Sequence, residues 1–357
     1  MNIAKGFFTH QEILSQPEAW SAALEVVGTE RQAILSLSGG SKEGQHFAQI
    51  IYAGCGSTYY LALAAAALTQ ELTGLPSRAF PASELWLYPR SSYVSGKTLL
   101  VAVSRSGETT ETLRACEAFL ADRRGDLLTL SCYGKMPLAK LGALNIVLPS
   151  GQEQSVAQTR AFSTLYLGTV ALACLWSGRL DLFDSLGRLP EIGGRILNHY
   201  APHAAELGRD PALERFYWLG SGPRQGLACE LSLKMKEMSL THSEPFYFME
   251  FRHGPKSMVT PQTLVIGLRS THNSLYERAV LEDVKALGGR TLDIAEDGSD
   301  AVPQGTYREI RFASGLDEAV RNVLYLPVGQ LIAFERSLSK DLNPDCPANL
   351  DTVVKLL

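Results

Sequence analysis

Short apolar runs alternate with helical segments along most of this chain, and that alternation limits the folds open to it. Strands that alternate with helices form a parallel sheet covered by helices on both faces, so the sequence predicts an α/β fold. The expected strands are 47–53, 78–80, 98–103, 126–132 and 144–148, then 216–219, 263–268, 291–294 and 310–312. The expected helices are 10–37, 60–72, 111–123, 162–176, 226–239 and 276–287.

The second half of the chain weakly repeats the first. Gly54-Cys55-Gly56 follows the first strand, and Gly220-Ser221-Gly222 follows a strand 166 residues later. The same offset relates Ser104 to Ser270, each just past a strand. We therefore expect two copies of one α/β unit. The expected boundaries are a helical leader over 1–40, a first unit over 41–190, a second unit over 195–340 and a tail over 341–357.

Composition excludes several classes of protein. The 357 residues carry a net charge of −4, which gives no basic surface for nucleic acid. The six cysteines include no C-x-x-C pair, which disfavours a zinc site or a disulfide framework and indicates reduced thiols. The N-terminus has no signal-type apolar core, and no apolar run reaches the roughly 20 residues that span a bilayer. We expect a soluble cytoplasmic protein without a membrane partner.

The segment from Ser104 to Thr109, Ser-Arg-Ser-Gly-Glu-Thr, lies directly after an apolar strand and before an expected helix. A helix N-terminus offers unpaired N–H groups to an anion. Three hydroxyls, a glycine and Arg105 favour a phosphate as that anion. An ordinary Ser/Thr helix cap is the alternative interpretation.

The Gly54–Thr58 turn does not indicate a dinucleotide site. Tyr59 stands where that fingerprint has its third glycine, and no acidic residue follows the second strand to hold a ribose. Ser57 and Thr58 are more plausible as further hydroxyls for the ligand of the Ser104 turn, because both turns follow parallel strands.

Two features of the second half could supply acid–base groups. Glu230, Lys234 and Glu237 share one helical face, either as a solvated ion-pair row or as a partly buried base with a lysine beside it. His253 precedes Gly254-Pro255, which places it on a turn, where a histidine is either simply solvated or catalytic.

Other kinds of site are not indicated. Cys229 and His242 have no partner at metal-ligand spacing, so both are interpreted as structural. No Gly-x-Ser-x-Gly elbow is present, which disfavours a hydrolase triad.

Taken together these motifs resemble the tandem sugar isomerase (SIS) family. The resemblance rests on Gly54–Thr58, Ser104–Thr109, the segment 153–162, Leu233–Glu237 and Arg252–Pro255, with similar sequence in the leader (11–17) and the tail (343–350). It extends over essentially the whole chain. It implies two SIS domains of flavodoxin-like three-layer architecture, the first binding a phosphosugar, the second supplying acid–base residues, with the tail over the active site.

The resemblance also implies roles for single residues. Ser57, Thr58, Ser104, Arg105, Ser106 and Thr109 would bind the phosphosugar, and Val156 and its neighbours would line the sugar. Glu237 would move a proton between C1 and C2, with Lys234 beside it. His253 would open the sugar ring, reaching in from the neighbouring subunit of a homodimer.

The chain resembles the isomerase half of glucosamine-6-phosphate synthase, and stand-alone aminosugar-phosphate deaminases and isomerases, but two departures from the synthase affect what we expect. We expect no glutaminase domain with an N-terminal cysteine before the isomerase leader, and therefore no glutamine hydrolysis by that route. The tail position that carries an imine-forming lysine in the relative is Thr352 here, among the expected binding residues, and Lys355 lies three residues further on.

The sequence thus predicts an enzyme, an isomerase or deaminase of an aminosugar 6-phosphate, that needs no metal or organic cofactor because a base and an acid suffice. A deglycase of amino-acid–sugar phosphate conjugates is an alternative activity. A sugar-phosphate sensor that binds without reacting is the alternative from another class.

Overall fold

A computed structural model describes residues 4–37, 47–298, 306–354 and 356. The first residues of the leader, the join between leader and first unit at 38–46, and Lys355 therefore lie outside the described part. The chain divides into two compact units. We name them by their strands: the β1–β5 unit contains residues 15–153, 160–190 and 351–357, and the β6–β10 unit contains residues 1–14, 154–159 and 191–350.

The β1–β5 unit is built on a parallel sheet with the strand order β2-β1-β3-β4-β5. This is the flavodoxin-like order, whose topological switch point lies between β1 and β3. The central strands are buried along their whole length because helices cover both faces. The strands are β1 Gln49–Gly54, β2 Ser77–Pro81, β3 Thr98–Ser104, β4 Gly125–Ser131 and β5 Leu144–Val147.

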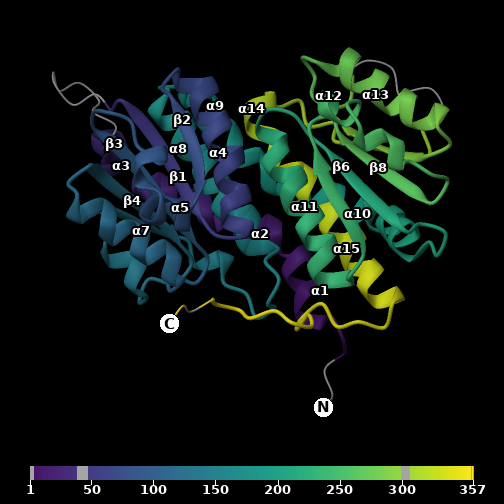
Figure 1. The fold of residues 1–357 in the computed structure, drawn as a ribbon, viewed down its shortest axis with the longest axis horizontal. Coiled ribbons are helices and arrows are strands. Elements are labelled where there is room, and N and C mark those ends of the chain that lie inside the picture. The colour runs from purple at the N-terminus through teal and green to yellow at the C-terminus, as the bar shows by residue number, and fades with distance from the viewer. Residues whose placement is uncertain (1–3, 38–46, 299–305, 355, 357) are drawn as a thin grey trace. The chain divides into compact units, whose positions relative to one another are not determined.

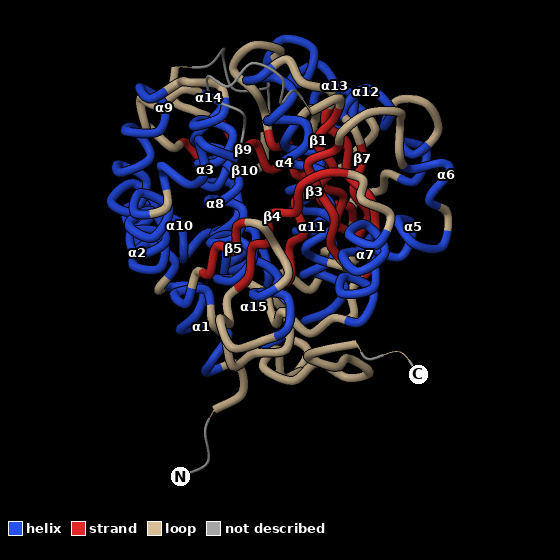
Figure 2. Tube along the Cα trace, turned by 90° about the vertical axis from the view of Figure 1, so that its left-hand side faces the viewer, coloured by secondary structure: helices blue, strands red, loops and turns tan. Residues whose placement is uncertain are grey.

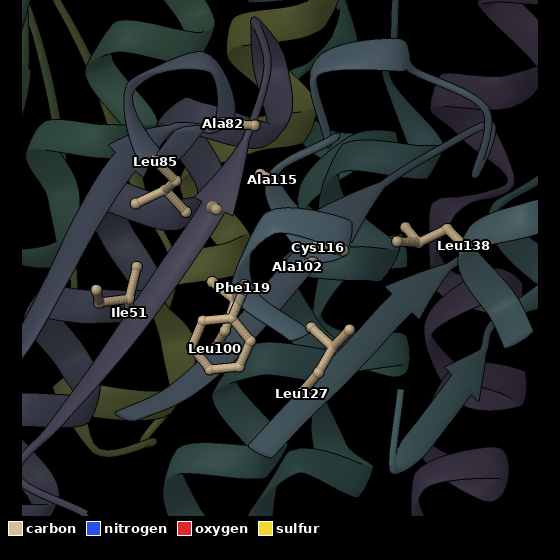
Figure 3. Packing of buried hydrophobic residues seen from close by; sticks show 11 residues of the cluster. Ile51, Ala82, Leu85, Leu100, Ala102, Ala115, Cys116, Phe119, Leu127 and Leu138 are labelled. Atoms are coloured by element: carbon tan, nitrogen blue, oxygen red, sulfur yellow. The ribbon is translucent and has the colours of Figure 1, made fainter. Parts of the chain in front are cut away.

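One face of this sheet is covered by α5 and α7, and the other by α4 and α8 (Figure 1). Figure 3 shows the core on the α5–α7 side, where Phe119 of α7 packs among aliphatic strand residues that include Leu100 and Leu127. On the opposite face, the Tyr52 hydroxyl of β1 is 2.8 Å from the Thr69 hydroxyl of α4. The helices of this unit are α2 Gln16–Thr29, α3 Arg31–Leu37, α4 Ser57–Thr73, α5 Ala82–Leu87, α6 Pro89–Ser92, α7 Thr110–Ala121, α8 Arg160–Trp176 and α9 Leu180–Ser185, with 3-10 turns over 137–140, 149–151 and 186–188.

The β6–β10 unit repeats the same topology. Its parallel sheet has the order β10-β9-β8-β6-β7, the flavodoxin-like order read from the other edge. The tube in Figure 2 shows its strands in red among the blue helices. The strands are β6 Arg215–Leu219, β7 His242–Phe246, β8 Thr263–Leu268, β9 Arg290–Ala295 and β10 Arg308–Arg311.

Helix α11 packs against α15 and against β6 and β7, and α12 and α13 pack against each other on the core of Tyr217, Val265 and Leu281. The helices of this unit are α1 Phe7–Leu14, α10 Leu189–Arg209, α11 Pro223–Ser239, α12 Phe248–Phe251, α13 Ser274–Ala286, α14 Glu318–Arg321 and α15 Leu326–Ser339, with 3-10 turns over 255–258 and 322–325. The first two residues of α10 belong to the other unit.

The predicted α/β fold with two parallel sheets is confirmed, and every predicted strand is present within about two residues of its expected bounds. The expected single helix over 10–37 is three helices in the structure. The sequence did not predict strand β7 or helices α5, α6, α9, α10, α12, α14 and α15. None of the helices within the described ranges is both long and apolar enough to cross a bilayer.

Candidate functional site

The Ser104 turn closes on itself through its hydroxyls. The Ser104 Oγ accepts the Gly107 N–H at 3.1 Å and lies 3.3 Å from the Thr109 hydroxyl. Gly107 has a φ of +71°, which an L-residue adopts only with strain, so the glycine is required by the turn. The segment therefore gathers two hydroxyls just before α7 begins at Thr110.

The helix-cap interpretation of this turn is not supported. Thr109 occupies the N-cap position of α7, yet its side chain accepts no hydrogen bond from the first turn of the helix. The Ser106 Oγ accepts the Glu108 N–H at 3.2 Å, and both Ser106 and Thr109 are partly exposed. The hydroxyls are thus positioned by the turn but are not used to cap the helix.

The Gly54–Thr58 turn lies at the same edge of the sheet as the Ser104 turn. Strands β1 and β3 are adjacent and parallel, so both turns follow carboxyl ends at the switch point, as expected. The Thr58 hydroxyl donates to the Cys55 carbonyl at 3.0 Å and accepts the Cys55 N–H at 2.9 Å. Its hydrogen is therefore used inside the turn, and a direct contact from Thr58 to a ligand stays a prediction. Ser57, the first residue of α4, is buried.

Arg105 is buried and paired within the chain. Its guanidinium lies 3.5 Å from the Glu153 carboxylate, whose side chain is fully buried, and donates to the Thr352 carbonyl at 3.1 Å. The tail continues along the start of α7, where the Thr110 N–H donates to the Val354 carbonyl at 3.5 Å. The charge expected at the phosphate end is therefore partly balanced by Glu153, and Arg105 fastens the tail beside the turn.

Helix α11 carries the candidate acid–base group. Lys234 is fully buried, and its Nζ lies 3.3 Å from Glu230 and 2.5 Å from Glu237. Burial would lower the pKa of Lys234, but the two carboxylates outweigh it and raise that pKa above its ordinary value. The solvated ion-pair row is therefore wrong for Glu230 and Lys234, which are both fully buried. Glu237 remains 18% exposed at the end of the row.

His253 lies on the turn between α12 and a 3-10 turn, and it is solvent-exposed in the single chain. Its N–H donates to the Glu250 carbonyl at 2.9 Å, and Gly254 follows with a φ of +124°. The turn predicted from Gly254-Pro255 is confirmed. The catalytic role of His253 stays a prediction.

Val156 lies in a short segment held by the leader and the tail. The Glu12 carboxylate accepts the Gln154 N–H at 2.6 Å and the Ser155 hydroxyl, and the Val156 N–H donates to the Asp345 carbonyl at 2.9 Å. The Asp345 side chain in turn accepts the Thr9 N–H at 2.8 Å. The sequence did not predict these supporting roles for Glu12, Glu153 and Asp345. Their only signal was their position in the leader, tail and 153–162 motifs.

Among the residues that the structure describes, no cluster of three or more His, Cys, Asp or Glu side chains could hold a metal ion.

Comparison with protein families settles the membership of the chain. The model described as "SIS domain" matches it twice, over residues 46–175 and 213–319. The chain belongs to the SIS domain family. The two matches coincide with the two repeated sheets, so the internal repeat is a tandem of SIS domains.

Curated relatives share the same range of sequence. The glutamine–fructose-6-phosphate aminotransferase (isomerizing) of Pseudomonas aeruginosa is 28% identical over 367 residues, covering 97% of this chain and 59% of its own length. The enzyme of that name from Methanothermobacter thermautotrophicus is 25% identical over 351 residues, covering 97% and 57%. The chain thus spans less than two thirds of the length of these relatives.

Solved structures show the same fold. The tagatose-6-phosphate ketose/aldose isomerase of Escherichia coli superposes with a TM-score of 0.84 at 22% identity, covering 97% of this chain and 96% of that one. The glucosamine-6-phosphate deaminase of Thermotoga maritima has a TM-score of 0.75 at 23% identity and covers 98% and 99%. The C-terminal domain of the glucosamine-fructose-6-phosphate aminotransferase of Francisella tularensis has a TM-score of 0.79 at 20% identity and covers 95% and 98%.

Proposed function

We propose that this protein is an enzyme that isomerises and deaminates an aminosugar 6-phosphate by moving a proton between C1 and C2. The observation that carries the proposal is the buried Lys234, which lies 2.5 Å from the carboxylate of Glu237, a side chain that is 18% exposed. A general base needs a carboxylate held in one orientation with its reactive oxygen accessible, and a buried ammonium group provides that orientation. A chain that only binds sugars has no need of such a pair.

The proposal assigns phosphate recognition to the Ser104 turn. Ser106 and Thr109 present partly exposed hydroxyls beside the N-terminus of α7, where N–H groups and the helix dipole favour a negative charge. Ser57 and the backbone of the neighbouring turn are at the same sheet edge. Arg105 adds positive charge behind the turn while its pairing with Glu153 keeps it in place.

The proposal assigns proton transfer to Glu237. With the sugar in its open form, Glu237 takes the proton from one of the two carbons and returns it to the other, so the carboxylate is regenerated. Transfer of the proton from C2 to C1 leaves an imine at C2, and water hydrolyses that imine to the C2 carbonyl, which releases ammonia and a ketose 6-phosphate. His253 is proposed to open the ring from the partner subunit of a homodimer. The names of the relatives, which act on fructose 6-phosphate, tagatose 6-phosphate and glucosamine 6-phosphate, support a hexose 6-phosphate.

The test is to incubate the protein in deuterated water with a panel of aminosugar 6-phosphates, ketose 6-phosphates and amino-acid–sugar phosphate conjugates. Proton exchange at C1 or C2 is followed by NMR, and released ammonia and amino acid are measured separately. The proposal predicts exchange, with ammonia from an aminosugar phosphate. Release of a free amino acid would favour the deglycase instead. Tight binding without exchange for any compound would show that the protein is a sensor.

A further inference from the structure

The two SIS domains contain the same pair of turns, and the turns have the same geometry. Gly56 and Gly222, 166 residues apart, stand at the starts of α4 and α11 with φ, ψ values of 55°, −123° and 57°, −135°. Ser104 and Ser270 have the same spacing. Each accepts the N–H of the third residue after it, at 3.1 Å from Gly107 and 2.9 Å from Asn273. The β6–β10 unit therefore retains the turn that the other unit is proposed to use for phosphate.

In the β6–β10 unit, carboxylates of the chain itself occupy this turn. The Glu277 carboxylate accepts the Ser270 N–H at 2.5 Å and the Ser270 hydroxyl at 3.0 Å. The Glu318 carboxylate accepts the Thr271 N–H at 2.6 Å. Two successive backbone N–H groups and a hydroxyl thus converge on negative charge, which is the donor pattern of an anion site.

Buried arginines complete the positive side of this site. Arg224 is at the position of Thr58 in the repeat and is 3% exposed. It donates to Glu318 at 2.5 Å and lies 3.9 Å from Glu277, while its Nε has no hydrogen-bond partner among the described residues. Arg321, also 3% exposed, lies 3.5 Å from Glu318 and donates to the Thr271 hydroxyl at 2.5 Å.

The corresponding glutamate of the first turn behaves differently. Glu111 is at the position of Glu277 in the repeat, but its Oε2 is buried without a hydrogen-bond partner in the described part of the chain. No carboxylate among the described residues hydrogen-bonds to the side chains of Ser104, Ser106 or Thr109. The hydroxyls of the first turn are thus left to an external anion, whereas the second turn has its own.

We infer that the β6–β10 unit holds a second phosphate-type anion site that Glu277 and Glu318 keep filled, so that only one of the two SIS domains binds a phosphorylated ligand. Glu318 is the outer of the two carboxylates, with a side chain 14% exposed against 3% for Glu277. Removing it uncovers the Thr271 N–H and leaves Arg224 and Arg321 with one carboxylate fewer, which favours uptake of an anion from solution.

The experiment uses inorganic phosphate as the probe and Glu318→Ala as the variant. Calorimetric titration should find one more phosphate per chain than in the parent, bound at least about tenfold more tightly than any second phosphate on the parent. Because phosphate then binds the folded state, it should also raise the melting temperature of Glu318→Ala more than that of the parent. The matched control is Glu309→Ala, which removes an exposed glutamate of the same unit.

Titrations repeated in a Ser106→Ala/Thr109→Ala background separate the two sites. Loss of the first phosphate there tests the proposed function, whereas the extra phosphate of Glu318→Ala tests this inference alone. If Glu318→Ala folds only when phosphate is present, the inference is supported. If Glu318→Ala does not fold at all, Glu318→Gln takes its place, because glutamine keeps the size of the side chain and removes its charge. Phosphate should then bind Glu318→Gln more tightly, and raise its melting temperature more, than it does for Glu309→Gln. Equal responses of the Glu318 and Glu309 variants would overturn the inference.

Discussion

Lys234 illustrates how one buried charge can organise a site. Its ammonium group is fully buried, and the carboxylates of Glu230 and Glu237 on the same helix face compensate for that burial. A buried ion pair contributes little net stability, but breaking it leaves an uncompensated charge. The pair is therefore better understood as a device that orients Glu237 than as a source of stability.

Replacing Lys234 with Met should destabilise the fold by about 3–5 kcal/mol, because Glu230 is left buried without its counter-charge. Glu230→Gln combined with Lys234→Met should recover much of that loss, whereas Lys236→Met, at an exposed position of the same helix, should change stability by less than about 0.5 kcal/mol. Urea unfolding measures all three. If Lys234→Met lowered the free energy of unfolding no more than Lys236→Met does, the burial of the Lys234–Glu230 pair would be contradicted.

The same lysine predicts a pH dependence. Its pKa is raised in the folded state, so the stability it contributes is fully present below its unfolded pKa of about 10.4 and is lost as the pH rises through the higher folded value. The difference in unfolding free energy between wild type and Lys234→Met should therefore shrink above about pH 10.4. A difference that grows with pH in that range would mean that the pKa is lowered instead.

The hydroxyls of the first turn make a separate prediction. Hydrogen bonds to a charged group contribute roughly 1.5–3 kcal/mol each, so Ser106→Ala with Thr109→Ala should weaken binding of any hexose 6-phosphate at least about tenfold. Titration calorimetry gives the affinity. Ser91→Ala, which removes an exposed hydroxyl of α6, serves as the control. Unchanged affinity in the double variant would place the phosphate elsewhere.

At the scale of the elements, the Gly54–Thr58 turn and the corresponding turn at Gly220–Gly222 depend on how α4 and α11 begin. Gly56 and Gly222 have positive φ values combined with ψ near −130°, a region in which side chains are strained, and a Cβ at either position would meet no atom within 4 Å. The requirement for glycine there is thus a matter of backbone conformation and not of space.

Gly56→Ala and Gly222→Ala should each destabilise the fold by about 1–3 kcal/mol through backbone strain. Gly28→Ala is the matched control, because Gly28 lies in α2 without positive φ and a Cβ there also meets nothing within 4 Å. That change should be neutral or stabilising by up to about 1 kcal/mol. Thermal unfolding distinguishes the two classes. Equal effects at all three glycines would contradict the strain.

The elements also show what the sequence could and could not predict. Strands such as β3 and β8 are continuous apolar runs between turns, and they were predicted because a strand buried on both faces must be apolar. Strand β7 was missed because it is an edge strand whose sequence, His242-Ser243-Glu244-Pro245-Phe246, lacks an apolar pattern and contains a proline.

Within the candidate site, spacing alone placed Glu230, Lys234 and Glu237 on one face, but it could not decide between a solvated row and a buried one. The burial of this face depends on tertiary packing around α11, which includes a contact with α15, a helix that was not predicted. The same limit applies to Arg105. Its partners, Glu153 and the Thr352 carbonyl, are 48 and 247 residues away in the sequence, so its pairing follows from tertiary structure.

At the scale of the whole molecule, the proposal requires that His253 acts on the substrate bound by a partner chain. Glu237→Gln and His253→Ala should each be inactive, yet equal mixtures refolded together should regain roughly a quarter of wild-type activity, because half of the dimers are mixed and each has one intact site. Activity of the mixture equal to the mean of the separate variants would show that each site is built within one chain.

The central claim is that Glu237 moves the proton, and exchange with deuterated water measures that step directly. Wild type should exchange the C1 or C2 proton of a hexose 6-phosphate, and Glu237→Gln should slow the exchange by about 10²–10⁴-fold while sugar-phosphate affinity stays within a few-fold. Glu282→Gln, at a partly exposed position of α13, should exchange like wild type. Exchange in Glu237→Gln at the wild-type rate would contradict the claim.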